Sequence, residues 1–127
     1  MEGPQPGMIG EASAVVTREQ SAAHLGSGDL DVLGTPALAA LMERAAVAAL
    51  QGRLGEGEST VGARIDLRHL APTPVGARIE ARARIAEVEG RRIRFQIEAR
   101  DERQTIGRAD HLRVVVDRAT FMAAVGG

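Results

Sequence analysis

The stretch DVLGTPALAALMERAAVAAL, which runs from Asp31 to Leu50, decides the fold of this chain. Pro36 suits the first turn of a helix, and Thr35 before it can act as an N-cap that accepts a hydrogen bond from a free backbone N–H. Three glycines end the apolar pattern: Gly52, Gly55 and Gly57. The pattern therefore predicts one long helix from about Thr35 to about Leu50. Because this helix is apolar on nearly every side, it needs cover over most of its surface.

The segments on either side of this helix are typical of strands. Residues 11–17 predict a short strand, and residues 21–31 predict a loop or a short helix. After the helix, four segments alternate apolar and polar side chains, as antiparallel strands with one buried face do. They are 59–70, 75–88, 91–100 and 105–117. In the first of the four, five side chains are expected to point the same way: Val61, Ala63, Ile65, Leu67 and His69.

Together these elements form an α+β pattern of one strand, one long helix and four more strands. A curved, mainly antiparallel five-stranded sheet wrapped around the helix would supply the cover that the helix needs, so the sequence predicts the hot-dog fold. Residues 1–9 are rich in Gly and Pro, and we expect them to be a flexible N-terminus. Residues 10–127 are expected to form a single domain.

Composition limits the classes of function. The formal net charge of −1 argues against nucleic acid as a partner. Cys is absent, and the three His residues (His24, His69 and His111) are too widely spaced for a metal-ligand motif, so we expect neither a metal nor a cofactor. No apolar run approaches the roughly 20 residues that span a bilayer, and the N-terminus lacks a secretory pattern. A cytoplasmic protein without a membrane partner is therefore expected.

Glu43 is the unusual residue of the helix. Its neighbours one turn away are Ala39, Ala46 and Val47, so no cation on the helix pairs with it. Glu43 either lies on a narrow exposed strip beside Arg44, or is a partly desolvated carboxylate poised to act as a base or a nucleophile.

Two further residues bear on this choice. His69 falls on the strand face that should meet the helix, where a His is either a core residue or a partner for Glu43. Thr35 is either a simple N-cap or a hydroxyl at the positive end of the helix, where N–H groups can hold an anion or a thioester oxygen. Eight helical residues rise about 12 Å, so Thr35 and Glu43 of one helix cannot touch, and a site at a dimer interface is favoured. His111 is expected to be a structural strand residue.

Three long segments resemble the fluoroacetyl-CoA thioesterase-like family of hot-dog proteins. They are GSGDLDVLGTPALAALMERAA (26–46), TVGARIDLRHLAPTPVGARIEARARI (60–85) and EVEGRRIRFQIEARDERQTIGRADHLRVVVD (87–117). The resemblance implies hydrolysis of a short acyl-CoA to a carboxylate and free CoA. It also implies a homodimer, which could pair further into a tetramer, with sheets joined edge to edge and active sites between the subunits.

The resemblance also implies roles for particular residues. The Thr, Glu and His of the family's catalytic set match Thr35, Glu43 and His69 in both type and spacing, and Gly62 matches a glycine associated with the acyl pocket. Members specific for fluoroacetyl-CoA carry aromatic residues near the start of the Thr segment. Here that stretch is GSGDLDVL, which has none, so we expect a different acyl group.

These matches lead to a hypothesis for the chemistry. Glu43 activates a water or attacks the thioester directly, His69 assists, and Thr35 orients the carbonyl. The phosphates of CoA need basic contacts, for which Arg64 and Arg113 are the leading candidates and Arg68, Arg91 and Arg92 are further ones. Two alternatives stay open: a hydratase or dehydratase of acyl thioesters, and a non-catalytic acyl-CoA-binding or purely structural domain.

Overall fold

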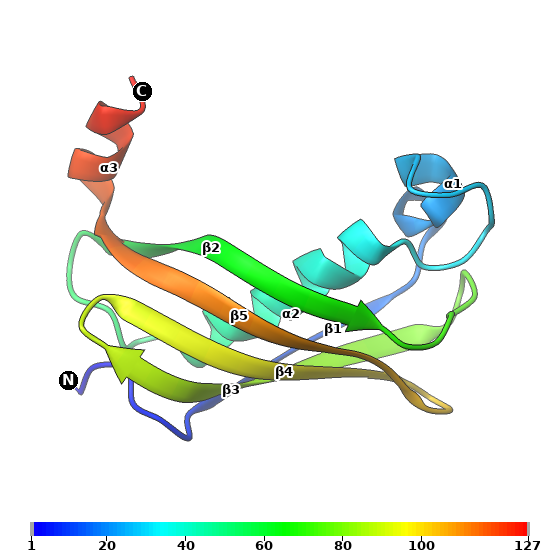
Figure 1. The fold of residues 1–127 in the computed structure, drawn as a ribbon, viewed down its shortest axis with the longest axis horizontal. Coiled ribbons are helices and arrows are strands. Elements are labelled where there is room, and N and C mark those ends of the chain that lie inside the picture. The colour runs from blue at the N-terminus through cyan, green and yellow to red at the C-terminus, as the bar shows by residue number, and fades with distance from the viewer. Residues whose placement is uncertain (1, 127) are drawn as a thin grey trace.

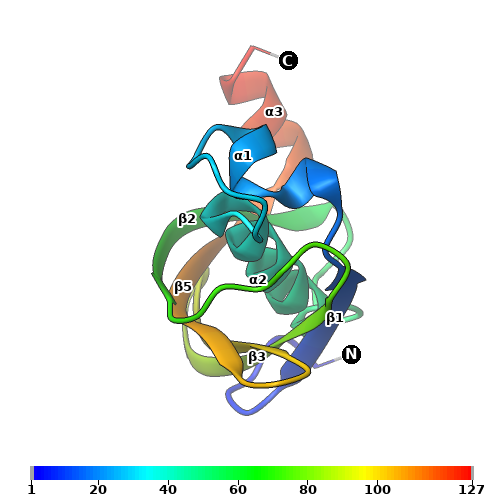
Figure 2. The ribbon, with the colours of Figure 1, turned by 90° about the vertical axis from the view of Figure 1, so that its right-hand side faces the viewer.

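The computed structural model describes residues 2–126, in which a curved sheet wraps around one long helix (Figures 1 and 2). The helix is α2 (Thr35–Ala49), and the strands lie in the order β1-β3-β4-β5-β2 with every neighbouring pair antiparallel. This arrangement confirms the predicted α+β hot-dog fold. The strands are β1 (Ile9–Val15), β2 (Glu58–His69), β3 (Arg78–Glu89), β4 (Arg92–Asp101) and β5 (Thr105–Asp117). The short elements are the 3₁₀ turn η1 (Arg18–Gln20), α1 (Ala22–Leu25) and α3 (Arg118–Ala124).

The start of α2 differs in one respect from the prediction. The N-cap is Gly34, and Thr35 is already inside the helix, so its hydroxyl does not cap the chain. Gly34 is buried against α1, and its N–H donates to the Gln20 carbonyl at 2.8 Å. A Cβ at Gly34 would lie 3.2 Å from the Ala22 backbone, which explains why a residue without a side chain caps this helix. The Thr35 hydroxyl is therefore free for another partner.

The core lies between α2 and the concave face of the sheet. One face of α2 is fully buried through Leu38, Leu41, Met42, Ala45, Ala46 and Ala49. The apolar positions predicted for β3 and β4 are buried against it, including Ile79, Ile85, Ile93 and Phe95. The β1 strand crosses close to the helix at Gly10, where a Cβ would collide with the Ala45 and Ala49 backbone. Small residues at this crossing allow the sheet to close around the helix.

The sheet buries less of the α2 surface than the apolar sequence of the helix predicted. Ala40, Arg44 and Val47 stay exposed along one strip of the helix, and Val47 is 50% accessible. Glu43 lies at the margin of this strip, with its side chain 41% exposed. Glu43 therefore has features of both interpretations. Its carboxylate lies on an exposed strip of the helix, and it also borders the interface between the helix and the sheet.

The expected alternation of β2 is wrong in its first half because the strand contains a β-bulge. Gly62 pairs with Arg113 and Arg64 pairs with Leu112, so Ala63 is the extra residue. An extra residue reverses which side chains face the core. Ile65, Leu67 and His69 follow the prediction, whereas Thr60 and Gly62 take the concave face in place of Val61 and Ala63.

The termini also differ from expectation. The first strand begins at Ile9 rather than residue 11, and Gly7 and Met8 already exchange backbone hydrogen bonds with Ile85. The flexibility expected for residues 1–9 stays a prediction, and Met1 lies outside the described residues. The sequence also missed α3, which Asp117 caps by accepting a hydrogen bond from the Thr120 N–H. No helix between residues 2 and 126 is long and apolar enough to cross a membrane.

Candidate functional site

Thr35 and His69 meet at the N-terminal end of α2. The Thr35 Oγ1 atom lies 2.8 Å from His69 Nδ1, which joins the first turn of the helix to the last residue of β2. The Thr35 backbone N–H has no hydrogen-bond partner among residues 2–126, and Pro36 carries no N–H at all. This end of the helix therefore presents one hydroxyl and one free amide donor together.

The surroundings of the His69 ring favour its neutral form. Burial lowers the pKa of the imidazole, and the Ala71 backbone opposes this effect only in part. Its Nε2 atom is buried and lacks a hydrogen-bond partner of good geometry within residues 2–126. A neutral imidazole can either accept the Thr35 hydroxyl proton at Nδ1 or donate to the hydroxyl oxygen. In both cases it fixes the position of Thr35 Oγ1.

Glu43 lies farther along α2, and it is not the unpaired carboxylate that the sequence indicated. The Arg113 guanidinium of β5 donates from Nη1 to Glu43 Oε2 at 3.1 Å. The other carboxylate oxygen, Oε1, accepts no hydrogen bond from the described part of the chain. The helix wheel could not show this pair, because the cation comes from a strand 70 residues later.

Gly62 makes room for the Glu43–Arg113 pair. A Cβ at this position would lie 2.5 Å from Glu43 Oε2 and 3.3 Å from Arg113 Nη1. The neighbouring Thr60, which sequence reasoning missed, accepts from Arg113 Nε at 2.9 Å through Oγ1 and from Nη2 at 3.3 Å through its carbonyl. Both residues reach the concave face through the β2 bulge, so only knowledge of the bulge could have found Thr60.

His111 is the second residue that sequence reasoning undervalued. It is 1% exposed, and its Nε2 atom lies 3.1 Å from Arg113 Nη1 and 3.8 Å from Glu43 Oε2. Its Nδ1 atom lies 2.7 Å from the Arg64 carbonyl oxygen. The available signal was the spacing His-Leu-Arg, which places His111 and Arg113 on one face of the last strand.

The two arginines proposed for CoA phosphates have different surroundings. Arg113 is 7% exposed and already bonded to Glu43 and Thr60, so this position does not suit a phosphate contact. Arg64 is exposed, and only its backbone carbonyl takes part in the cluster. An open groove of about 500 Å³ runs along the exposed strip of α2 and is lined by Glu43, Arg44, Val47 and Arg113 among others. The carboxylate therefore faces space that a substrate could enter.

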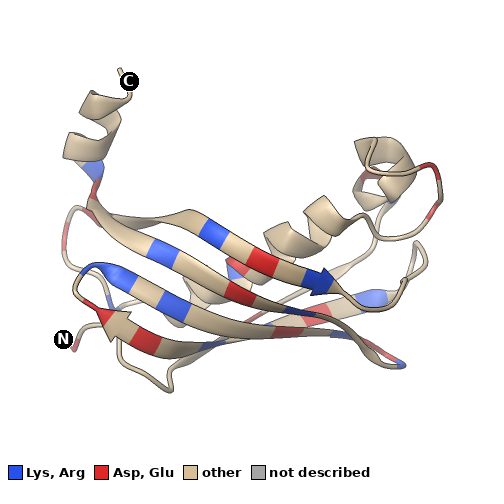
Figure 3. Cartoon of the chain, in the orientation of Figure 1, with Lys and Arg blue, Asp and Glu red and all other residues tan. Residues whose placement is uncertain are grey.

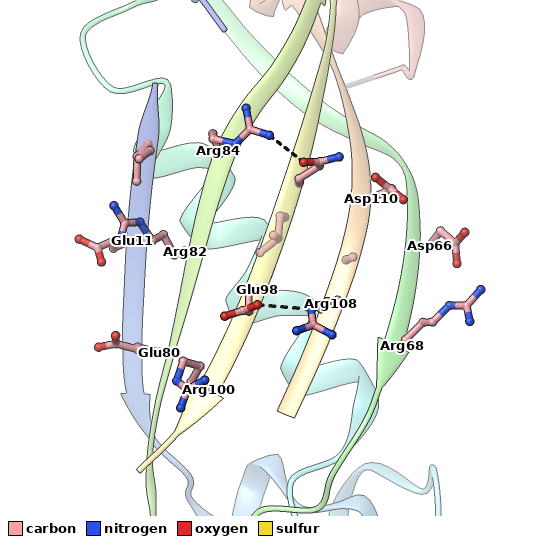
Figure 4. Close-up of a pocket in the computed structure, with 14 residues that line it drawn as sticks. Glu11, Asp66, Arg68, Glu80, Arg82, Arg84, Glu98, Arg100, Arg108 and Asp110 are labelled. Atoms are coloured by element: carbon pink, nitrogen blue, oxygen red, sulfur yellow. Dashed lines mark hydrogen bonds and ion pairs between the residues drawn. The ribbon is translucent and has the colours of Figure 1, made fainter. Parts of the chain in front are cut away.

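A larger hollow, of about 910 Å³, lies on the outer face of the sheet, away from α2 and from all the predicted catalytic residues (Figure 4). Its walls carry five arginines and five carboxylates, and Figure 3 shows both signs mixed along the strands. Balanced charge gives an anion such as CoA no preference for this face. No group of three His, Asp or Glu side chains in residues 2–126 is placed to hold a metal ion.

Comparison with known proteins identifies the family to which this chain belongs. Residues 16–119 match the family described as fluoroacetyl-CoA-specific thioesterase. The fluoroacetyl-CoA thioesterase of Streptantibioticus cattleyicolor is 36% identical over 95 residues, which cover 75% of this chain and 68% of that protein. A crystal structure of the fluoroacetyl-CoA thioesterase FlK superposes with a TM-score of 0.91 at 31% identity, covering 98% of this chain and 96% of that one. The structure of a thioesterase superfamily member from Thermus thermophilus also superposes with a TM-score of 0.91. It is 28% identical, and the match covers 98% of this chain and 93% of that one.

Proposed function

Since this chain belongs to the fluoroacetyl-CoA-specific thioesterase family, we propose that it hydrolyses the thioester of a short acyl-CoA to a carboxylate and free CoA. Two variants of FlK have been solved with ligands, one with acetyl-CoA and the other with fluoroacetate and CoA. For this chain, the substrate class is carried over from those relatives. The segment before Thr35 holds no aromatic residue, which supports a natural acyl group other than fluoroacetyl.

The observation that carries the proposal is the state of the Glu43 carboxylate. Arg113 holds one oxygen at 3.1 Å, the other accepts no hydrogen bond from residues 2–126, and the side chain lines an open groove. A carboxylate that is fixed at one oxygen and exposed at the other is suited to attack a thioester or to remove a proton from an attacking water. Single turnover in ¹⁸O-labelled water tests the direct route. If Glu43 displaces CoA to form a mixed anhydride and water then attacks the Glu43 carbonyl, the label stays in Glu43 and the product takes an unlabelled oxygen. If Glu43 only activates a water, the label enters the product and never Glu43.

Thr35 and His69 are the proposed partners for the substrate carbonyl. The hydroxyl and the free N–H of Thr35 lie at the positive end of α2, where developing negative charge on the thioester oxygen is stabilised. His69 holds the hydroxyl in place through the 2.8 Å contact. In this scheme His69 assists only through Thr35. Removal of one hydrogen-bond donor to the carbonyl oxygen, such as the Thr35 hydroxyl, typically costs about 10²-fold in kcat.

Distance along the helix favours a site shared by two copies of the chain. Thr35 and Glu43 are separated by a rise of about 12 Å, so one protomer places its two hydrogen-bonded pairs too far apart to act on one carbonyl. The β2 strand is an edge of the sheet and lies beside both pairs. In the proposed dimer a second copy pairs along this edge, so that Thr35 and His69 of one subunit act with Glu43 of the other. The exposed Arg64 is the proposed contact for CoA phosphates.

The function is tested by free-thiol release from acyl-CoAs of increasing chain length, plain and halogenated. We expect release from short acyl-CoAs by the wild-type protein. Release from none of them, with saturable binding of the esters, would overturn the hydrolase proposal in favour of a binding domain. Release of no thiol together with hydration of an enoyl-CoA would favour the hydratase alternative.

The shared site is tested by mixing two inactive variants. If Glu43→Gln and His69→Gln protomers are unfolded and refolded together, half of the random dimers are mixed, and each mixed dimer carries one intact site. Activity should therefore return to about a quarter of the wild-type value. If one protomer supplied the whole site, every site in the mixture would lack a residue and no activity would return.

A further inference from the structure

The buried His111 joins the Glu43–Arg113 pair through a hydrogen bond whose direction can be worked out from its neighbours. The Arg64 carbonyl oxygen, 2.7 Å from Nδ1, can only accept a hydrogen bond, so Nδ1 must carry a hydrogen. The Arg113 guanidinium, 3.1 Å from Nε2, can only donate, so Nε2 must present its lone pair. Both contacts are satisfied by one form of the ring alone, the neutral Nδ1–H tautomer.

This tautomer determines where the Arg113 hydrogens point. One hydrogen of Nη1 goes to His111 Nε2 and the other to Glu43 Oε2, with both heavy-atom distances at 3.1 Å. Thr60 accepts from Nε and Nη2 on the other side of the guanidinium. Since Arg113 and His111 are 7% and 1% exposed, water does not replace these partners. The guanidinium is therefore held on two sides and aims one hydrogen at the catalytic carboxylate.

We propose that His111 is a positioning residue for the thioesterase reaction: its neutral Nδ1–H tautomer orients Arg113, and Arg113 in turn holds Glu43 at the groove. The inference rests on the proposed function for its catalytic consequence. His111 contacts no substrate atom in this scheme, and it acts only through the guanidinium. A protonated His111 would turn a hydrogen toward Arg113 in place of the lone pair, and it would compete for Glu43 Oε2 at 3.8 Å.

The surroundings of His111 favour the neutral ring. The charged groups that face it are Glu43 from α2 and Arg113 from its own strand. From β4 it meets the Phe95 ring, at 6.0 Å between centroids, and from β2 it meets Gly62 and the Arg64 backbone. Burial is the main cause that lowers the pKa of His111, and the Arg113 charge adds to this effect while Glu43 opposes it. Loss of Arg113 should accordingly let His111 take up a proton at higher pH.

The tautomer is tested first, by ¹⁵N NMR of the ring nitrogens in the wild-type protein, without any measure of activity. We expect a protonated Nδ1 and an unprotonated Nε2 at neutral pH, and a higher pKa of His111 in Arg113→Met. An Nε2–H tautomer or a charged ring in the wild type would overturn the proposal. Because this readout needs no substrate, it stays informative even if the thioesterase function itself fails.

The positioning role is tested by three substitutions and a double-mutant cycle. His111→Asn keeps a donor for the Arg64 carbonyl but loses the acceptor for Arg113, and it should lower kcat about 10- to 100-fold with little change in KM. His111→Gln offers an acceptor near the former Nε2 and should recover most of this loss. In the Arg113→Met background, His111→Asn should cost almost nothing further, because the residue through which it acts is gone.

Two results would contradict the positioning role. If the effects of His111→Asn and Arg113→Met on kcat simply multiply, His111 does not act through Arg113. If His111→Gln loses as much kcat as His111→Asn while both variants melt at the wild-type temperature, the acceptor is not what matters. Arg108→Met, which removes an arginine from the opposite face of the same strand, is the matched control.

Discussion

Two arginines of β5 form ion pairs with carboxylates on opposite faces of the same sheet, and the pairs differ mainly in burial. On the outer face, Arg108 meets Glu98 at 3.3 Å with side chains 63% and 46% exposed (Figure 4). On the concave face, Arg113 meets Glu43 at 3.1 Å with side chains 8% and 41% exposed. The outer pair is exposed to water, where such pairs contribute little. The inner pair has a buried cation and a carboxylate that still reaches solvent, which is the combination that the proposed function uses.

The register of the strands explains why the two arginines of β5 find their carboxylate partners on different elements. Glu98 pairs directly with Arg108 across β4 and β5, and Arg82 lies on the other side of Glu98. On the concave face, the neighbours of Arg113 are Gly62 and Ile93, so no carboxylate of the sheet can neutralise it. The helix must supply one, and Glu43 is the residue that reaches it.

Apart from removal of the Glu43 carboxylate itself, the largest effect should come from filling the space beside the inner pair. In Gly62→Ala the added Cβ would meet Glu43 Oε2 at 2.5 Å, so the carboxylate must shift from its observed position beside Arg113. We expect kcat for thiol release to fall about 10²-fold or more, since a shift of about 1 Å in a reacting group has consequences of this size. Steady-state kinetics with a short acyl-CoA measure this. Gly62→Ala with wild-type kcat would show that the pair is not needed in the observed position.

A somewhat smaller effect is expected when the inner cation is removed. Arg113→Met leaves Glu43 present but without its anchor, and kcat should fall about 10- to 100-fold. Stability should also fall, by about 1–3 kcal/mol, because His111 and Thr60 each lose a buried hydrogen-bond partner. Kinetics and urea denaturation measure the two effects. Equal losses of kcat in Arg113→Met and Arg108→Met would contradict a specific role for the arginine on the concave face.

A pH effect on stability between about pH 5.5 and 7.5 should arise from the two histidines of the inner face. Burial lowers the pKa of both His69 and His111 below the ordinary value of 6.5. Below about pH 6.5 the unfolded chain therefore binds protons that the folded chain does not, so the free energy of unfolding falls as pH is lowered. Denaturation at pH 7.5, 6.5 and 5.5 tests this, and His111→Gln should show a shallower fall than the wild type. If the free energy of unfolding depended on pH in the same way in the wild type and in His111→Gln, the lowered pKa of His111 would be contradicted.

The smallest effect is expected on the outer face. Arg108→Met removes an exposed ion pair, and the free energy of unfolding should change by no more than about 0.5 kcal/mol, with kcat unchanged. Thermal melting and thiol release measure the two quantities. A loss of activity in Arg108→Met would mean that the outer face takes part in the reaction.

The sequence predicted the features that depend on local pattern. The alternation in β3 and β4 identified Ile79, Ile85, Ile93 and Phe95 as core, and the Thr-Pro start located α2. The choice of Thr35, Glu43 and His69 as one set came from the family resemblance, and the structure brings Thr35 and His69 together.

Other features could not be read from local pattern. The bulge at Ala63 depends on how β2 pairs with β5, and the β2 side chains before it change face as a result. The Glu43–Arg113 pair joins residues 70 positions apart, and the presence of His111 beside it follows from the same register. Arg113 therefore looked like one more basic strand residue until the strand pairing was known.

The most direct test compares the two carboxylates in one assay. Glu43→Gln and Glu98→Gln make the same chemical change on the concave and outer faces, and thiol release from a short acyl-CoA is measured for both beside the wild type. The proposed function predicts turnover by the wild type and by Glu98→Gln, and its loss in Glu43→Gln with an unchanged melting temperature. Undiminished turnover by Glu43→Gln would contradict the central role of this carboxylate.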